Sequence, residues 1–144
     1  MVSAYKIVVD TDVLLDHLRG DQSPSVLRVA MSKFLCYTTV FNAIEVLSAA
    51  NSALESGLIE DALAPMKLLG LSARGARRYS SMLARGRPRN RWHMLIAGLC
   101  LESRLPLLTG RWADFQGAEG LVLVPPRLVT AGLSAKDILE AIRS

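Results

Sequence analysis

The stretch Ile7-Val8-Val9-Asp10-Thr11-Asp12-Val13-Leu14-Leu15 decides how this chain folds. A short apolar run ends in a carboxylate, a second carboxylate follows two residues later, and another apolar run comes next. Aspartate is a poor residue for the middle of a strand or helix, but it suits the point where a strand stops and a helix begins, as cap or ligand. The stretch therefore predicts an α/β crossover, with both acids at the carboxyl end of a buried parallel strand, where open α/β sheets place their sites.

Length and composition narrow the class of protein. At 144 residues the chain is predicted to form one domain, residues 1–144, and its 51% hydrophobic content supports a substantial core. No signal-like N-terminus and no run of about 18 uninterrupted apolar residues is present, so neither export nor a membrane partner is expected. Cys36 and Cys100 lie in apolar runs, which predicts buried thiols in a reducing compartment, the cytoplasm, rather than a disulfide.

Positive charge is concentrated in one segment of a chain whose formal net charge is +4. Between Ser72 and Trp92 there is no Asp or Glu, and the arginines there are Arg74, Arg77, Arg78, Arg85, Arg87, Arg89 and Arg91. A planar guanidinium can donate two hydrogen bonds to one phosphate group, so this segment could follow a nucleic-acid backbone. On charge alone, a solvated helix face and loop is an equally good interpretation.

Strands and helices are predicted to alternate along the chain. Expected strands cover 5–9, 35–38, 106–109 and 121–124, and expected helices cover 13–18, 25–31, 40–54, 58–69, 72–83, 92–103 and 134–143. Gly57 is expected to break the chain between two of these helices. The alternation predicts a parallel sheet covered by helices on both faces.

Four acids, Asp10, Asp12, Glu45 and Asp114, lie at expected strand ends or inside apolar segments. The strand ends of a parallel sheet meet at one edge, and several carboxylates there would repel one another unless a divalent cation is bound. Oxygen ligands suit Mg²⁺ or Mn²⁺ and a phosphate substrate. For Glu45 the alternative is a side chain that points to solvent from the helix edge, the usual position of glutamate.

Five segments carry a resemblance to a known family. They are IVVDTDVLLDHLRG at 7–20, TTVFNAIEVL at 38–47, IAGLCLESRLPLLT at 96–109, TGRWADF at 109–115 and GLVLVP at 120–125. In this order and spacing they resemble PIN-domain proteins, especially toxin ribonucleases of VapC type, over about residues 5–126. The resemblance implies a three-layer α/β/α domain with a central, mainly parallel sheet of four to five strands. It also implies a Mg²⁺- or Mn²⁺-dependent endoribonuclease.

The resemblance also implies roles for single residues. Asp10, Glu45 and Asp114 match metal-binding acids of the family, and Asp12 falls beside or among the metal ligands. The family's third acid is His93 here, which is expected to be catalytic as a further ligand or general base, or else to be a helix-start histidine without a catalytic task. Arg111 stands where an Asn is common and is expected to contact an RNA phosphate or to pair with Asp114.

Two functions follow from this comparison. The first is a metal-dependent endoribonuclease, the toxin of a type II toxin–antitoxin system, which cleaves RNA and forms a homodimer blocked by a cognate antitoxin. Its RNA phosphates are expected to contact Arg87, Arg89, Arg91 and Arg111. The second is a catalytically degenerate PIN-like domain that binds RNA or a protein partner, and His93 and Arg111 favour it. A third possibility, a purely structural or dimerisation module, is supported only by the apolar surface and the expected C-terminal helix.

Overall fold

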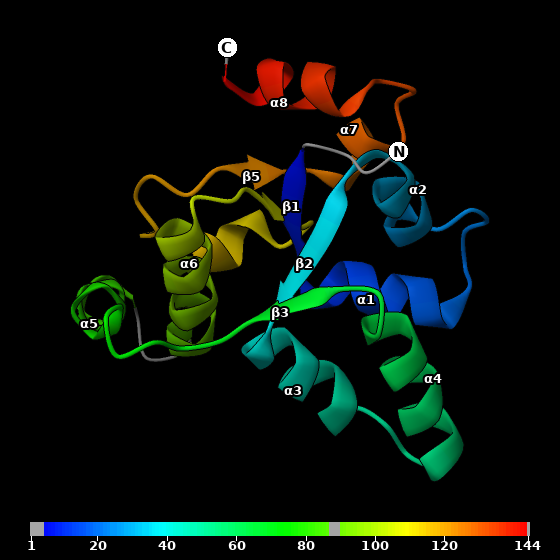
Figure 1. The fold of residues 1–144 in the computed structure, drawn as a ribbon, viewed down its shortest axis with the longest axis horizontal. Helices are drawn as coiled ribbons and strands as arrows, with labels where there is room; N and C mark the ends of the chain where they lie inside the picture. The colour runs from blue at the N-terminus through cyan, green and yellow to red at the C-terminus, as the bar shows by residue number, and fades with distance from the viewer. Residues whose placement is uncertain (1–4, 87–89, 144) are drawn as a thin grey trace.

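The computed structural model describes residues 5–86 and 90–143, and a parallel sheet runs through its middle (Figure 1). The strand order is β3-β2-β1-β4-β5, and every strand pair is parallel. The strands are β1 Lys6–Val9, β2 Leu35–Thr39, β3 Lys67–Leu69, β4 Leu107–Leu108 and β5 Leu123–Val124. This confirms the predicted parallel sheet.

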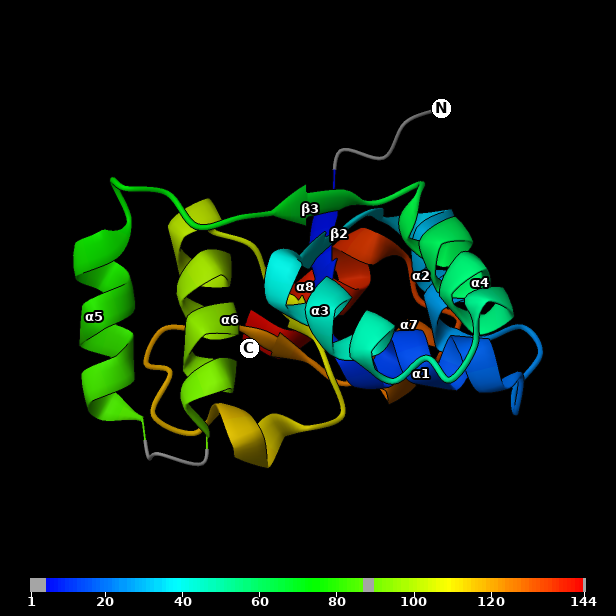
Figure 2. The same cartoon turned by 90° about the horizontal axis from the view of Figure 1, so that it is seen from below.

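Helices cover both faces of the sheet, as predicted. They are α1 Thr11–Arg19, α2 Val26–Lys33, α3 Val40–Ser48, α4 Ala53–Leu63, α5 Ala76–Arg85, α6 Arg91–Ser103, the 3₁₀ helix η2 Trp112–Phe115, α7 Pro126–Val129 and α8 Ala135–Arg143. Figure 2 shows α5 and α6 on one side of the strands and α1, α2 and α4 on the other.

The central strand β1 explains why this layering forms. Ile7, Val8 and Val9 have no exposed surface, because parallel strands in the middle of such a sheet are buried on both faces. Successive side chains of a strand point to opposite faces. Ile7 and Val9 accordingly join the core under α1, α2 and α8, while Val8 joins the core under α5 and α6.

One predicted helix was wrong. The segment 58–69 was expected to be helical after a break at Gly57, but α4 runs through Gly57 and ends at Leu63, and Lys67–Leu69 form the edge strand β3. Ser52 starts the helix by accepting a hydrogen bond from the backbone N–H of Glu55. That cap and the burial of Ile59 and Leu63 offset the roughly 1 kcal/mol that glycine costs inside a helix.

Several further boundaries differ from the sequence prediction. The helix expected over 72–83 is α5, Ala76–Arg85, and the strand expected over 121–124 is β5, Leu123–Val124. The helix expected over 40–54 is α3, which ends at Ser48, because the chain turns before Ser52 caps a new helix. Pro125 and Pro126 follow the last strand and start the short helix α7, with Pro126 at a first-turn position that needs no N–H donor.

Cys36 and Cys100 are free and buried, as expected from the sequence. Burial raises the pKa of the Cys36 thiol to about 12 and raises that of Cys100 as well. Among residues 5–86 and 90–143, no helix combines the length and apolar character needed to cross a membrane.

Candidate acidic site

Asp10 lies at the carboxyl end of β1, where the register sets it beside the end of β4. Its side chain has no exposed surface. Oδ1 accepts hydrogen bonds from Asn42 Nδ2 at 2.8 Å and from Arg111 Nη2 at 2.9 Å. Oδ2 accepts hydrogen bonds from Thr109 Oγ1 at 2.7 Å and from Arg111 Nε at 3.1 Å. A carboxylate offers about four lone-pair positions, so protein donors fill the acceptor capacity of Asp10.

Asn42 links the first turn of α3 to this carboxylate. Its Oδ1 accepts from the hydroxyl and the backbone N–H of Thr39, which completes a capping box at the start of the helix. Its amide then donates to Asp10 and to Thr11 Oγ1, at 2.8 and 2.9 Å. The carbonyl oxygen of the Asn42 side chain thus caps the helix, and its amide nitrogen holds the buried carboxylate of Asp10. Every polar group of this buried side chain therefore has a partner.

Asp12 lies in the first turn of α1 and faces the loop after β4. Its Oδ2 accepts from the backbone N–H of Gly110 at 2.8 Å. A Cβ at residue 110 would lie 2.9 Å from that oxygen, so a larger residue there would push the Asp12 carboxylate aside. Burial raises the pKa of Asp12 above its usual value, and the charge of Asp10 raises it further.

Glu45 also points into this site rather than to solvent. Its side chain is 25% exposed, and Oε1 accepts a hydrogen bond from Thr11 Oγ1 at 2.9 Å. The same oxygen lies 3.8 Å from Arg111 Nη2. The structure thus brings Asp10, Asp12 and Glu45, three of the four acids singled out in the sequence, to one edge of the sheet.

Arg111 is the cation at the centre of these acids. The sequence suggested an RNA phosphate or Asp114 as its partner, whereas the structure pairs it with Asp10 through two nitrogens. Burial alone would lower the pKa of Arg111, but the hydrogen bonds and charge of Asp10 raise it above the usual value, with help from Glu45 and Asp12. The guanidinium is therefore firmly charged at any physiological pH.

His93 and Asp114 form a separate pair. His93 stands in the first turn of α6, and its Nε2 lies 3.7 Å from Oδ2 of Asp114, which belongs to η2 and is about half exposed. This distance is too long for a hydrogen bond, and neither imidazole nitrogen has a hydrogen-bond partner within the described residues. The His93 ring instead packs edge-on against Phe115, with ring centroids 5.3 Å apart.

As arranged here, these residues do not fit a divalent cation. Across the described residues 5–86 and 90–143, no three His, Cys, Asp or Glu side chains gather in a way that could hold a metal ion. The four hydrogen bonds to Asp10 leave it no lone pair to give a metal, and Arg111 supplies positive charge in its place. The expected Mg²⁺ or Mn²⁺ site stays a prediction.

Arginines gather on a second surface, beside α5. A depression of about 580 Å³ is lined in part by Arg74, Arg77, Arg78, Arg85 and Arg104. Arg85 Nη1 pairs with Glu119 Oε2 at 3.2 Å, and both side chains are largely exposed. Of the arginines predicted to contact phosphate, Arg91 is exposed at the start of α6, and Arg87 and Arg89 lie outside the described residues.

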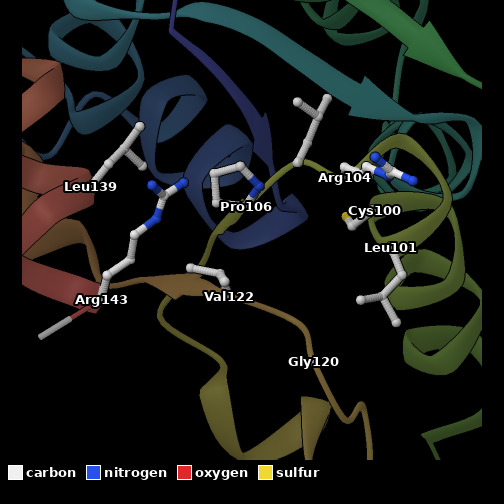
Figure 3. A pocket seen from close by; sticks show the side chains of 9 residues that line it. Cys100, Leu101, Arg104, Pro106, Gly120, Val122, Leu139 and Arg143 are labelled. Carbon is white, nitrogen blue, oxygen red and sulfur yellow. The ribbon is translucent and has the colours of Figure 1, made fainter.

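A third feature is a cavity of about 270 Å³ at the amino ends of β4 and β5, the sheet edge opposite to Asp10 (Figure 3). Figure 3 shows Arg143 of α8 and Arg104 at the end of α6 on opposite sides of the opening, with Pro106 between them. The cavity is lined mainly by aliphatic side chains, and no acid is among its described lining residues. It is therefore separate from the acidic site.

Sequence reasoning missed the neutral residues that complete the acidic site, which are Thr11, Asn42, Thr109 and Gly110. A partial signal existed, because Thr11 and Asn42 lie in the first turn of a helix and Thr109 and Gly110 lie in the loop directly after β4. Nothing in the local sequence shows which acid they contact.

Comparison with solved structures identifies the fold. VapBC from Salmonella typhimurium, bound to DNA, matches with a TM-score of 0.68 at 15% identity, covering 85% of this chain and 98% of that chain. VapBC2 from Rickettsia felis, bound to a DNA fragment from its promoter, gives 0.67 at 12% identity, covering 83% and 98%. A toxin–antitoxin complex from Klebsiella pneumoniae gives 0.64 at 21% identity, covering 83% and 97%.

The fold is PIN-like. These matches cover nearly the whole of the compared chains, so the PIN-like architecture extends over most of this molecule. At identities of 12 to 21% the likeness concerns the fold. No protein-family model and no curated protein sequence matches the chain.

Proposed function

We propose that this chain is the toxin-type member of a toxin–antitoxin pair and that it acts on RNA. The observation that carries the proposal is the convergence of Asp10, Asp12 and Glu45 at the carboxyl edge of a PIN-like parallel sheet. That edge is where α/β sheets place their sites. The exposed arginines along α5 support a polyanionic substrate, because phosphate contacts dominate the affinity of proteins for nucleic acids.

Endoribonuclease cleavage is the activity we propose first. Cleavage at this edge would require the Arg111 guanidinium to leave Asp10, since Asp10 has no unused acceptor position. An RNA phosphate is a suitable new partner for that guanidinium, because it offers the same bidentate geometry as a carboxylate. Dependence on Mg²⁺ or Mn²⁺ belongs to this proposal as a prediction from the sequence.

Binding of RNA or of a protein without cleavage is the second candidate. The two-pronged ion pair between Arg111 and Asp10 favours it, because a neutralised acidic site can hold a ligand without hydrolysing it. The His93 ring stands where the resemblance places the family's third acid, and its nitrogens make no hydrogen bond within the described residues, which points the same way.

A protein partner is the third part of the proposal. The matched structures from Rickettsia felis and Salmonella typhimurium are VapBC assemblies bound to DNA, and by analogy we propose a cognate antitoxin for this chain. Exposed apolar side chains on α3 and α4 support a protein contact, either with the antitoxin or with a second copy in a homodimer. They are Ile44, Leu47, Leu54 and Leu58.

An RNA cleavage assay tests the activity. Purified chain is incubated with mixed single-stranded RNA and Mg²⁺, Mn²⁺ or EDTA, beside Asp10→Asn and the exposed control Asp61→Asn, after circular dichroism has shown that each variant is folded. We expect cleavage that needs a metal and is lost in Asp10→Asn alone. Cleavage that persists in EDTA or in Asp10→Asn would overturn the ribonuclease proposal. Binding of RNA without any cleavage would establish the second candidate.

A further inference from the structure

We propose that Arg111 is the resident cation of the acidic site and that, in the free chain, it excludes divalent metal ions from Asp10. This deepens the proposed function, because it concerns the regulation of the same site and rests on that site's identity. In this role one side chain supplies the positive charge that a metal ion brings to an acidic cluster.

The geometry of the guanidinium supports this role. Two of its nitrogens hold the two oxygens of Asp10 at 2.9 and 3.1 Å, and Nη2 also faces Glu45 Oε1 at 3.8 Å. Such a fork places positive charge between two carboxylates that belong to different elements, one after β1 and one on α3. A metal ion that neutralised the same pair of acids would have to occupy this position.

The backbone around Arg111 holds the side chain in place. Its N–H donates to Thr109 Oγ1 at 2.9 Å, and that hydroxyl donates to Asp10 Oδ2 at 2.7 Å. The loop, the hydroxyl and the carboxylate thus form one hydrogen-bonded ring. Arg111 is also only 27% exposed, so water competes weakly for its donors.

Two energetic costs oppose the binding of a divalent ion at Asp10. It would have to break two charge-assisted hydrogen bonds to a carboxylate without exposed surface, and it would then lie beside the displaced guanidinium, a like charge. Removing the guanidinium takes away both obstacles, and the side chains of Asp10, Glu45 and Asp12, which stand at one edge but do not gather around a common point, are then free to turn toward an ion. The structure therefore assigns Arg111 as the switch between a metal-excluding site and a metal-accepting site.

Binding of Mn²⁺, measured by the loss of its free-ion electron paramagnetic resonance signal and by calorimetry, tests the proposal without RNA. The variants are Arg111→Ala, Arg111→Gln and the matched control Arg127→Ala, which removes one exposed arginine from α7. We expect Arg111→Ala to bind one Mn²⁺ at least about tenfold more tightly than the natural chain, a difference of about 1.4 kcal/mol. Arg127→Ala should behave as the natural chain does.

The location of the ion is tested with Asp10→Asn in the Arg111→Ala background, which should abolish the added binding. Two results would overturn the proposal. The first is a natural chain that binds Mn²⁺ at Asp10 as tightly as Arg111→Ala does. The second is Arg111→Ala and Arg111→Gln both folded by circular dichroism and both without Mn²⁺ binding. Because RNA is absent, failure here is distinguishable from failure of the ribonuclease proposal.

Discussion

Replacing Arg111 by alanine is expected to be among the most destabilising single changes at the surface of this protein. The substitution removes two hydrogen bonds to a buried carboxylate and leaves the Asp10 charge with Asn42 and Thr109 as its donors. Removing one partner of a buried ion pair costs about 3–5 kcal/mol. Since Arg111 is 27% exposed and two donors remain on Asp10, we expect about 2–4 kcal/mol.

Urea unfolding followed by far-ultraviolet circular dichroism measures this loss in metal-free buffer. The matched control Arg127→Ala, an exposed arginine, should change stability by less than about 0.5 kcal/mol. In a thermal scan each kcal/mol corresponds to about 2–4 °C for a chain of this size, so Arg111→Ala should melt about 4–16 °C lower.

A double-mutant cycle isolates the ion pair from other effects of the substitution. Asp10→Asn in the Arg111→Ala background should recover part of the lost stability, because an asparagine amide leaves no unpaired buried charge. The reasoning is refuted if Arg111→Ala costs less than about 1 kcal/mol, or if the coupling between the two positions is near zero.

Three further predictions concern other parts of the site and the basic segment. The pKa of Asp12 is raised in the folded chain, so the native state holds its proton more tightly than the unfolded state and the carboxylate lowers stability at neutral pH. Asp12→Asn should therefore raise the urea midpoint at pH 7, with the gain vanishing below about pH 3.9; an equal gain at pH 3 would contradict this. Asn42→Ala removes the capping box and a donor to Asp10 and should cost about 2 kcal/mol or more in the same assay, against little change for an exposed asparagine. Replacing Arg87, Arg89 and Arg91 together by glutamine should weaken single-stranded RNA binding and reduce the slope of log K against log salt by about 2; an unchanged slope would show that this segment does not touch phosphate.

The class of fold could be predicted from the sequence because the hydrophobic pattern of each strand and helix depends on residues close together in the chain. The run Ile7–Val9 is apolar without alternation, which is what a parallel strand buried on both faces needs, and the structure buries all three residues. Because aspartate is a poor strand residue, the sequence also predicts that the strand ends at Asp10. The alternation of strands and helices then predicted a covered parallel sheet, because parallel strands need crossover connections.

Boundaries failed where partners distant in the chain decided the outcome. Lys67–Leu69 carry no strong strand signal, and they are a strand because Tyr37, Thr38 and Thr39 of β2 offer them a parallel edge. Gly57 lies inside a helix because Ile59 and Leu63 on that helix are buried in the core. Burial of neighbouring side chains at Gly57, and parallel pairing with β2 at Lys67–Leu69, outweighed local preferences of at most about 1 kcal/mol per residue.

By itself the sequence determined which chemical groups the site contains and at which ends of the strands they stand. Only the tertiary structure decided which groups meet. The parallel register of β1 and β4, with Val9 beside Leu108, sets Thr109 and the following loop against Asp10. The Arg111 guanidinium consequently lies on a carboxylate 101 residues earlier in the chain, rather than on Asp114 in its own loop. Contacts over that separation depend on strand register and burial, and neither is encoded in a short stretch of sequence.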